Sequence, residues 1–277
     1  MPEGPEIRRE AKRLARMVVG QPIARLDYRL PALARRARSL RGHHVTDVTS
    51  HGKAMLIAWS NGLTHFSHNQ LYGEWVVVTT PEVDALMAER PRSVRVVIGV
   101  ERAAAVLMSA TWIELLTARE LAVQPYLARL GPDVLDRGTT APGVVKRLLD
   151  ARFARRSLAA LLLDQTFLAG LGNYLRSDIL HLARLRHTRR PADLRAPALQ
   201  RLAEAIVALP RQSVRTAGAT NDVALMQALA ARGVSRAARR FRAYGRDGEP
   251  CWICGTTIRR VDVAGRGIYF CPRCQPA

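Results

Sequence analysis

The chain has 277 residues, which is long enough for two domains that each bury their own core. Its 43 Lys and Arg residues exceed the 23 Asp and Glu residues and give a formal net charge of +20. Codon bias can exchange Lys for Arg but cannot create this surplus, which predicts a polyanionic partner, nucleic acid before an anionic membrane. No apolar run is long enough to span a bilayer, and the N-terminus lacks a signal-peptide layout. We therefore expect a cytoplasmic protein without membrane segments.

The first six residues, MPEGPE, carry an unusual combination of groups. If Met1 is removed, Pro2 presents a secondary amine directly beside the carboxylate of Glu3. An α-amino group has a pKa of about 8, against about 10.4 for Lys, so more of it is neutral and able to attack a carbonyl or aldehyde carbon. The iminium ion that proline forms has no N–H proton to lose and stays cationic. The alternative is an ordinary frayed end.

Residues 7–19 have the apolar periodicity of an amphipathic helix, which would hold Pro2 in one place. Several short β-branched runs follow, and at this spacing they predict an antiparallel sandwich or barrel. Asn61-Gly62 is a hairpin signal between two of these runs. The predicted strands are residues 45–48, 55–59, 64–67, 75–79, 94–100 and 103–108.

Two turns of this β region are candidate functional elements. Lys53 follows Gly52 just before a strand, where a compact point charge suits a phosphate or proton chemistry, although a single Lys is usually a solvated charge. Residues 68–73 form a predicted loop that contains Gln70, Leu71 and Tyr72. These side chains combine hydrogen bonding to base edges with bulk that can enter a vacated space in a base stack. The alternative is that Leu71 and Tyr72 close over a core.

The rest of the chain is predicted to be mainly helical, starting at residues 110–127 and continuing after a Pro- and Gly-containing linker. Gly170, Gly172 and an N-capping Asn173 would expose backbone N–H groups at a helix start, which suits one phosphate. An ordinary helix-turn-helix joint explains the same glycines. Residues 213–242 allow no assignment beyond a partly helical pattern at 222–231. The other predicted helices are residues 144–149, 158–167, 174–185 and 198–209.

The four cysteines have the spacing of a four-thiolate zinc site, with two CxxC pairs separated by 16 residues. Two disulfides are the competing interpretation, which the absence of secretion features disfavours. Residues 257–263 and 268–270 predict a hairpin with residues 264–267 as its tip, where Arg266 could reach a phosphate. We expect one structural Zn²⁺ held by Cys251, Cys254, Cys271 and Cys274.

Taken together, these residues resemble the bacterial family of bifunctional DNA glycosylases that includes formamidopyrimidine-DNA glycosylase and endonuclease VIII. The similarity runs nearly the whole length, through residues 2–6, 51–53, 163–173, 247–251 and the ribbon ending at 271–274. Residues 67–73, SHNQLYG, are most similar to the endonuclease VIII branch. The resemblance implies an α+β fold in two domains, with DNA in the cleft between them. Its parts would be an N-terminal catalytic β-sandwich with flanking helices (1–125), a linker (126–133), a helix-two-turns-helix domain (134–245) and a zinc-ribbon hairpin (246–277).

The resemblance also implies a role for each candidate residue. Pro2 would attack C1′ of the damaged nucleoside, Glu3 would act as acid and base on the sugar, and Glu6 would fix the first helix. Lys53, Asn173 and Arg266 would hold phosphates, with Gly172 beside them, while Gln70, Leu71 and Tyr72 would fill the gap in the duplex. Asp178 departs from the Glu that the family commonly has, and residues 213–242 align too poorly to assign lesion contacts.

The expected activity is excision of oxidised pyrimidines followed by β,δ-elimination, carried out by a monomer on double-stranded DNA that contains oxidised bases or abasic sites. Two alternatives stay open. One is the same chemistry with a preference for oxidised purines. The other is a non-enzymatic zinc-ribbon protein that binds nucleic acid, which explains the charge and the zinc but gives no reason for Pro2-Glu3 or Lys53.

Overall fold

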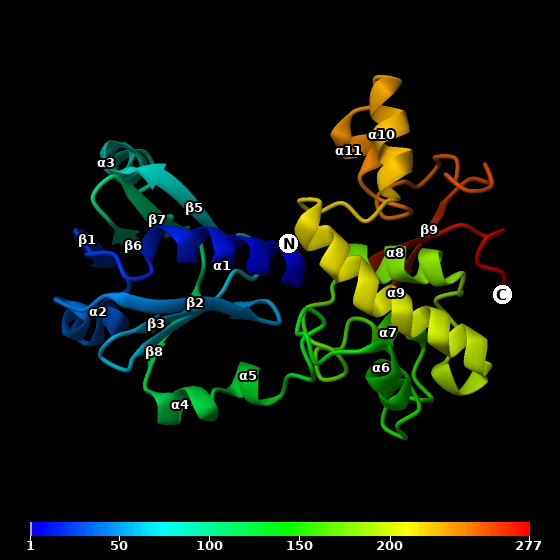
Figure 1. The fold of residues 1–277 in the computed structure, drawn as a ribbon, viewed down its shortest axis with the longest axis horizontal. Coiled ribbons are helices and arrows are strands. Elements are labelled where there is room, and N and C mark those ends of the chain that lie inside the picture. The colour runs from blue at the N-terminus through cyan, green and yellow to red at the C-terminus, as the bar shows by residue number, and fades with distance from the viewer. Residues whose placement is uncertain (1) are drawn as a thin grey trace. The chain divides into compact units, whose positions relative to one another are not determined.

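The structure, a computed structural model, describes residues 2–277; Met1, on whose removal the amine chemistry of Pro2 depends, lies outside the described residues. Contacts between residues divide the chain into two compact units, residues 1–129 and 130–277 (Figure 1). The first unit contains the strands of two sheets, and the second is mainly helical. None of the helices in residues 2–277 is both long and apolar enough to cross a membrane.

Unit 1 is an antiparallel β-sandwich, as predicted. Met55 and Ile57 of one sheet and Ile98 and Leu107 of the other are buried in one shared core. One sheet has the strand order β1 (Arg25–Tyr28), β6 (Val94–Gly99), β7 (Ala103–Met108), β5 (Glu74–Thr79). The other has the order β2 (Val45–His51), β3 (Ala54–Trp59), β4 (Thr64–His68), β8 (Trp112–Leu116). The predicted hairpin at Asn61-Gly62 joins β3 to β4.

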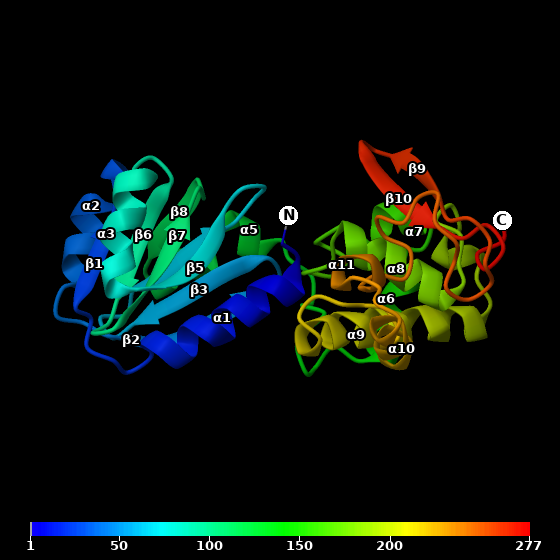
Figure 2. The ribbon, with the colours of Figure 1, turned by 90° about the horizontal axis from the view of Figure 1, so that it is seen from above.

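Helix α1 (Gly4–Val18) packs against β2 and β3 (Figures 1 and 2). Ile7, Ala11, Leu14 and Val18 are buried at spacings of four, three and four residues, which is the apolar stripe of an amphipathic helix. The helix begins three residues earlier than predicted, at Gly4, because a proline is compatible with the first turn of a helix. Pro2 therefore lies only two residues before the helix.

The helical prediction for residues 110–127 was wrong in its first part. Residues 112–116 form β8, where Ile113 and Leu115 point into the core and alternate with less buried neighbours. This two-residue period is that of a strand, and pairing with β4 satisfies its backbone groups. Two helices of unit 1 were not predicted, α2 (Pro31–Ala37) and α3 (Thr80–Glu89). The helical part of residues 110–127 is divided into α4 (Ala118–Ala122) and α5 (Pro125–Ala128).

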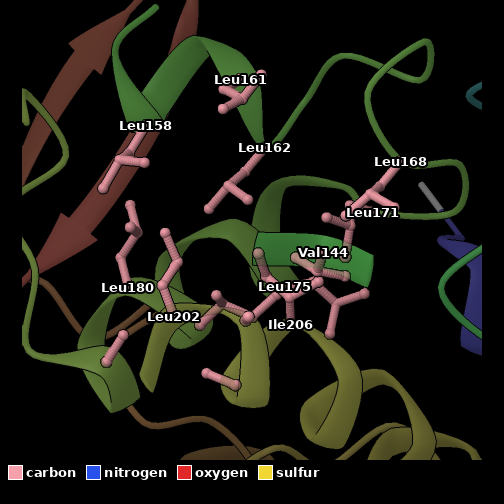
Figure 3. Packing of buried hydrophobic residues seen from close by; sticks show 14 of the residues in the cluster. Val144, Leu158, Leu161, Leu162, Leu168, Leu171, Leu175, Leu180, Leu202 and Ile206 are labelled. Carbon is pink, nitrogen blue, oxygen red and sulfur yellow. The ribbon is translucent and has the colours of Figure 1, made fainter. Parts of the chain in front are cut away.

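The core of unit 2 is formed by leucine-rich helices (Figure 3). Leu175 and Leu180 of one helix lie against Leu202 and Ile206 of another within this core. The predicted helix at 158–167 is one short helix, because Gln165 turns its side chain back onto the carbonyl oxygens of Leu163 and Leu171 at 2.9 Å each. The helices are α6 (Ala141–Leu148), α7 (Leu158–Leu161), α8 (Asn173–Ala183) and α9 (Ala196–Arg215).

Residues 213–242, which the sequence left largely unassigned, are folded in the structure. They comprise the end of α9, then α10 (Val223–Ala231) with Asp222 as its N-cap, and α11 (Arg236–Arg239) (Figure 1). The C-terminal hairpin consists of β9 (Arg259–Val263) and β10 (Arg266–Phe270), visible in Figure 2. Its tip is therefore the two residues Ala264 and Gly265, shorter than the predicted four.

Candidate active site and DNA-binding elements

The N-terminus of α1 is built from the acidic residues of the PEGPE motif. Glu3 is the N-cap of α1 and only 4% exposed, and its backbone N–H donates to Glu6 Oε2 at 3.1 Å. Glu3 and Glu6 form a capping box, which satisfies N–H groups that a helix start leaves without partners. Pro2, half-buried, immediately precedes this cap. The backbone beside the candidate nucleophile is thus fixed by a defined hydrogen bond.

The turn that carries Lys53 is tied to the same helix. Gly52 and Lys53 form the two-residue connection between β2 and β3, and Gly52 has the left-handed φ of 58° that this turn requires. Lys53 is only 8% exposed, and its backbone N–H donates to the hydroxyl of Tyr126 at 3.2 Å. Arg8 of α1 donates through Nε to Ser50 Oγ at 2.7 Å, near the end of β2. The end of β2 and the turn that follows it therefore position both the buried Lys53 and helix α1.

The loop between β4 and β5 presents two large apolar side chains to solvent. Leu71 is 61% exposed and Tyr72 is 81% exposed, so neither closes over a core. Gln70 has a left-handed φ of 52°, and its backbone N–H donates to His68 Nδ1 at 3.0 Å. Burial and the nearby Lys53 cation lower the pKa of His68 to about 4, which leaves its ring neutral and able to accept this bond. A Cβ at Gly73 would lie 2.5 Å from the Asn69 carbonyl oxygen, so the loop end needs glycine.

Helix α1 also contacts the base of this loop, through a residue that the sequence analysis missed. Asn69 is buried, and its Nδ2 donates to Glu10 Oε2 at 3.4 Å. Burial raises the pKa of Glu10 to about 7, and the carboxylates of Glu6 and Glu74 add to the effect. Only the position of Glu10, one turn after Glu6 on the same helix, was available as a signal in the sequence.

In unit 2 the structure brings two of the predicted phosphate ligands together. Gly172 is the N-cap of α8 and Asn173 its first residue, so the prediction of Asn173 as N-cap was wrong. One N–H of the Asn173 amide nitrogen donates to the carbonyl oxygen of Gly267 at 2.9 Å. Gly267 follows Arg266, an exposed residue that begins β10 directly after the turn at Ala264 and Gly265. Asn173 and Arg266 thus lie on neighbouring elements.

A buried arginine that the sequence did not single out connects these two residues. Arg176 is 1% exposed, and its Nη2 donates to Asn173 Oδ1 at 2.6 Å. The same nitrogen lies 3.4 Å from the carbonyl oxygen of Arg266 and 3.3 Å from that of Gly267. With Oδ1 accepting from a guanidinium, the amide nitrogen of Asn173 must face the hairpin. In the sequence, Arg176 was one of many arginines.

Asp178, where the chain departs from the common Glu, anchors the segment before the zinc ribbon. Its buried carboxylate accepts the backbone N–H groups of Arg242, Ala243 and Tyr244 at 2.8–2.9 Å, and also the hydroxyl of Thr220. An aspartate is long enough here because the backbone of residues 242–244 lies close to helix α8, which carries Asp178. The shorter side chain therefore keeps the turn supported.

The four cysteine sulfurs are arranged as a tetrahedral zinc site requires. All lie within 4.8 Å of one another, and the Cys251–Cys274 and Cys254–Cys271 separations are 3.9 and 3.5 Å. Four thiolates at about 2.3 Å from one Zn²⁺ would be about 3.8 Å apart, so the donor set fits the ion. With four protein ligands there is no open position for water. The site is therefore structural.

Comparisons with known proteins agree over the whole chain. Residues 1–109 match the formamidopyrimidine-DNA glycosylase N-terminal domain, 130–224 match the H2TH domain of the same protein, and 248–277 match a zinc finger found in FPG and IleRS. Proteins named Endonuclease 8 from Escherichia coli and Klebsiella pneumoniae are each 44% identical over 275 residues, which cover 99% of this chain and all of the relative. A crystal structure of Lactococcus lactis formamidopyrimidine-DNA glycosylase, bound to DNA with an AP site, aligns with a TM-score of 0.79 at 21% identity, covering 99% of this chain and 100% of the other.

The chain therefore belongs to the formamidopyrimidine-DNA glycosylase family, with curated relatives on the endonuclease VIII branch. It is a bifunctional DNA glycosylase and AP lyase of base excision repair, with one structural zinc. This assignment decides against a non-enzymatic zinc-ribbon protein and confirms the resemblance drawn from the sequence.

Proposed function

We propose that Pro2 is the nucleophile of this enzyme. Its amine would form a bond to C1′ as the bond between C1′ and the damaged base breaks. The C1′–O4′ bond of the sugar would then break, with a proton passing to O4′, and leave a ring-opened, cationic iminium ion. That cation acidifies the C2′ proton, and loss of this proton expels the 3′ phosphate by β-elimination, after which δ-elimination releases the 5′ phosphate. The observation that supports this assignment is the 3.1 Å hydrogen bond from Glu3 N–H to Glu6, which fixes the chain one residue after Pro2.

Glu3 and Lys53 are proposed to work beside this amine, with Glu6 as a positioning residue. A carboxyl group next to the nucleophile can protonate the sugar ring oxygen and later accept a proton, which is general acid–base catalysis. Glu3 and Lys53 are both almost completely buried, and removal of water strengthens the interaction of each charge with a reacting group. Lys53 is proposed to bind a phosphate close to the reacting sugar.

The DNA contacts proposed for the rest of the chain follow from exposed or preorganised groups. Arg266, together with the second N–H of the Asn173 amide nitrogen and the backbone at Gly172, would bind phosphates next to the flipped nucleotide. Leu71 and Tyr72 are proposed to enter the space that the nucleotide leaves, with Gln70 at the base edges, because they project into solvent from a loop with defined geometry. The substrate is double-stranded DNA, and we infer that the enzyme acts as a monomer in the bacterial cytoplasm, where that DNA is found.

The proposed substrates are oxidised pyrimidines, and the sequence of the loop at residues 67–73 is what favours them over oxidised purines. The test compares single-turnover excision of thymine glycol or dihydrouracil with excision of 8-oxoguanine opposite cytosine. Faster excision of the pyrimidine lesions is expected. The opposite order would assign the enzyme to oxidised purines and leave the chemistry of Pro2 unaffected.

Borohydride trapping tests the nucleophile directly. The processed enzyme should form a stable adduct with an abasic oligonucleotide, and mass spectrometry should place the sugar on the N-terminal peptide. An uncleavable N-terminal extension converts the amine into an amide and should abolish trapping while DNA binding persists. The control is an enzyme with a C-terminal extension of the same length, which leaves the N-terminal amine free. An adduct on Lys53, or one that survives the extension, would show that Pro2 is not the nucleophile.

A further inference from the structure

Helix α8 faces the zinc ribbon with three polar side chains spaced four residues apart. Asn173 Nδ2 donates to the Gly267 carbonyl oxygen at 2.9 Å, and Ser177 Oγ accepts the backbone N–H of Tyr269 at 3.3 Å. His181 completes the series, with its Nε2 3.4 Å from Cys251 Sγ. Residues four apart lie on one face of a helix, so the three contacts form a single row. The last of them reaches a zinc ligand.

The hydrogen-bond donors to two other cysteines come from the ribbon itself. The hydroxyl and backbone N–H of Thr256 hydrogen-bond Cys254, and the backbone N–H of Cys274 lies 3.4 Å from Cys271 Sγ. His181 is instead 70 positions away from Cys251 in the chain. Its contact therefore joins the metal site to the core of unit 2, where α8 is almost entirely buried.

The direction of this hydrogen bond follows from the chemistry of its two partners. A thiolate on zinc carries no proton and can only accept, so His181 must hold its proton on Nε2 and donate it. The ring is 1% exposed, which excludes water as a competing partner for this proton. His181 is not a fifth ligand, since the four sulfurs already form a closed tetrahedral set.

We infer that His181 is an outer-sphere residue of the zinc site, whose Nε2–H donates to the Cys251 thiolate and holds the ribbon to α8. Donation to a thiolate withdraws charge from the sulfur and fixes its orientation, and both effects slow its protonation and departure from the metal. The same row of contacts ends at Asn173. Retention of zinc and the position of Asn173 next to the hairpin are therefore coupled through one helix.

Zinc transfer to a chromophoric chelator tests this inference, with three variants of the full-length zinc-loaded enzyme. His181→Leu keeps an apolar side chain of similar size but no donor, and should release zinc about 10-fold faster or more. His181→Gln retains an N–H donor and should release zinc at a rate close to that of the wild type. His187→Leu is the matched control, because His187 is also buried and packs on Phe270 of the hairpin, 5.1 Å between ring centroids, but makes no hydrogen bond to a cysteine.

The Co²⁺-substituted enzyme gives a second reading of the same bond. Loss of the donor in His181→Leu should shift the sulfur-to-cobalt absorption bands to lower energy while leaving their intensity at that of four thiolates. Bands of lower intensity in the wild type, indicating three thiolates and one nitrogen, would overturn the inference by making His181 a ligand. Equal release rates and equal bands for the Leu variant and the wild type would also overturn it.

A measurement on the unmodified protein covers the case in which His181→Leu does not fold. In the ¹⁵N-labelled zinc enzyme, the ring of His181 should show the tautomer protonated at Nε2, with that proton protected from exchange. A ring protonated only at Nδ1 would contradict the inference independently of every variant.

Discussion

The carboxylate of Glu6 accepts the backbone N–H of Glu3 at 3.1 Å, one residue after the proposed nucleophile. A second capping box of the same design begins α3, where Glu82 accepts the N–H of Thr79 at 2.7 Å. The two helices share a motif but only α1 leads into the candidate site. Comparing variants of Glu6 and Glu82 therefore distinguishes the effect of a capping box on stability from its effect on catalysis.

Glu6→Ala and Glu82→Ala are each expected to lower the free energy of unfolding, because each removes the acceptor that satisfies the backbone N–H of the N-cap residue in a capping box. Only Glu6→Ala should reduce the rate of borohydride trapping at an abasic site, because only this change releases the backbone beside Pro2. Thermal unfolding and trapping kinetics on both variants provide the comparison. If both variants lost trapping equally, Glu6 would contribute only to the stability of the fold and not to the position of Pro2.

Glu10 is expected to make the protein less stable as the pH rises through about 4.5 to 7. Burial raises its pKa to about 7 in the folded state, so there it keeps a proton that the unfolded chain releases. Glu10→Gln removes this titration and should increase the free energy of unfolding by on the order of 3 kcal/mol at pH 8, with little change at pH 4.

The control for Glu10 has the opposite sign. Hydrogen bonds from Thr79 lower the pKa of Glu82, so its contribution is present at neutral pH and is lost in acid. Denaturant unfolding from pH 3 to 8 distinguishes the pH dependence of Glu10 from that of Glu82. A Glu10→Gln variant with the same pH profile of stability as the wild type would refute the raised pKa of this carboxyl group.

Arg266→Ala should weaken DNA binding and reduce the slope of log K against log salt by about one, the value for one lost phosphate contact. Arg102→Ala removes an equal charge from an exposed site in unit 1 and serves as the control. Binding titrations at several salt concentrations measure both slopes. Equal slopes for Arg266→Ala and Arg102→Ala would show that Arg266 makes no specific phosphate contact.

Asn173→Ala is expected to have a larger structural effect than Arg266→Ala. It removes the 2.6 Å hydrogen bond from the buried Arg176 guanidinium and a donor to Gly267, and loss of a hydrogen bond to a charged group costs about 1.5–3 kcal/mol. Thermal unfolding should therefore show a clear loss for Asn173→Ala and little for exposed Arg266→Ala. Similar melting of both variants would indicate that Arg176 finds another partner.

Cys271→Ala should release zinc and weaken DNA binding, because the hairpin that carries Arg266 depends on the metal. Metal analysis and DNA titration on the same sample test this prediction. Full DNA affinity in a zinc-free, folded variant would show that the hairpin keeps its structure without the metal ion.

The fold was predictable where the pattern has a single period or a fixed spacing. Short β-branched runs between turn residues located six strands, and the cysteine spacing located the metal site. Residues 112–116 were misassigned because five residues beside a helical pattern carry too little periodicity, and only pairing with β4 makes them a strand. Asn173 was misplaced by one position because its amide bonds to Gly267, 94 residues away, a partner that no local rule supplies. Arg176 and His181 were missed for the same reason.

The small apolar core of the zinc ribbon contains Ala243, Ile258 and two of the metal ligands themselves, Cys251 and Cys271. Side chains that bind the metal are thus also the side chains that fill the interior. Oxidation of either sulfur would remove a ligand and leave a polar group in that interior in one step. The chemistry that damages bases is also the chemistry to which this part of the repair enzyme is most vulnerable.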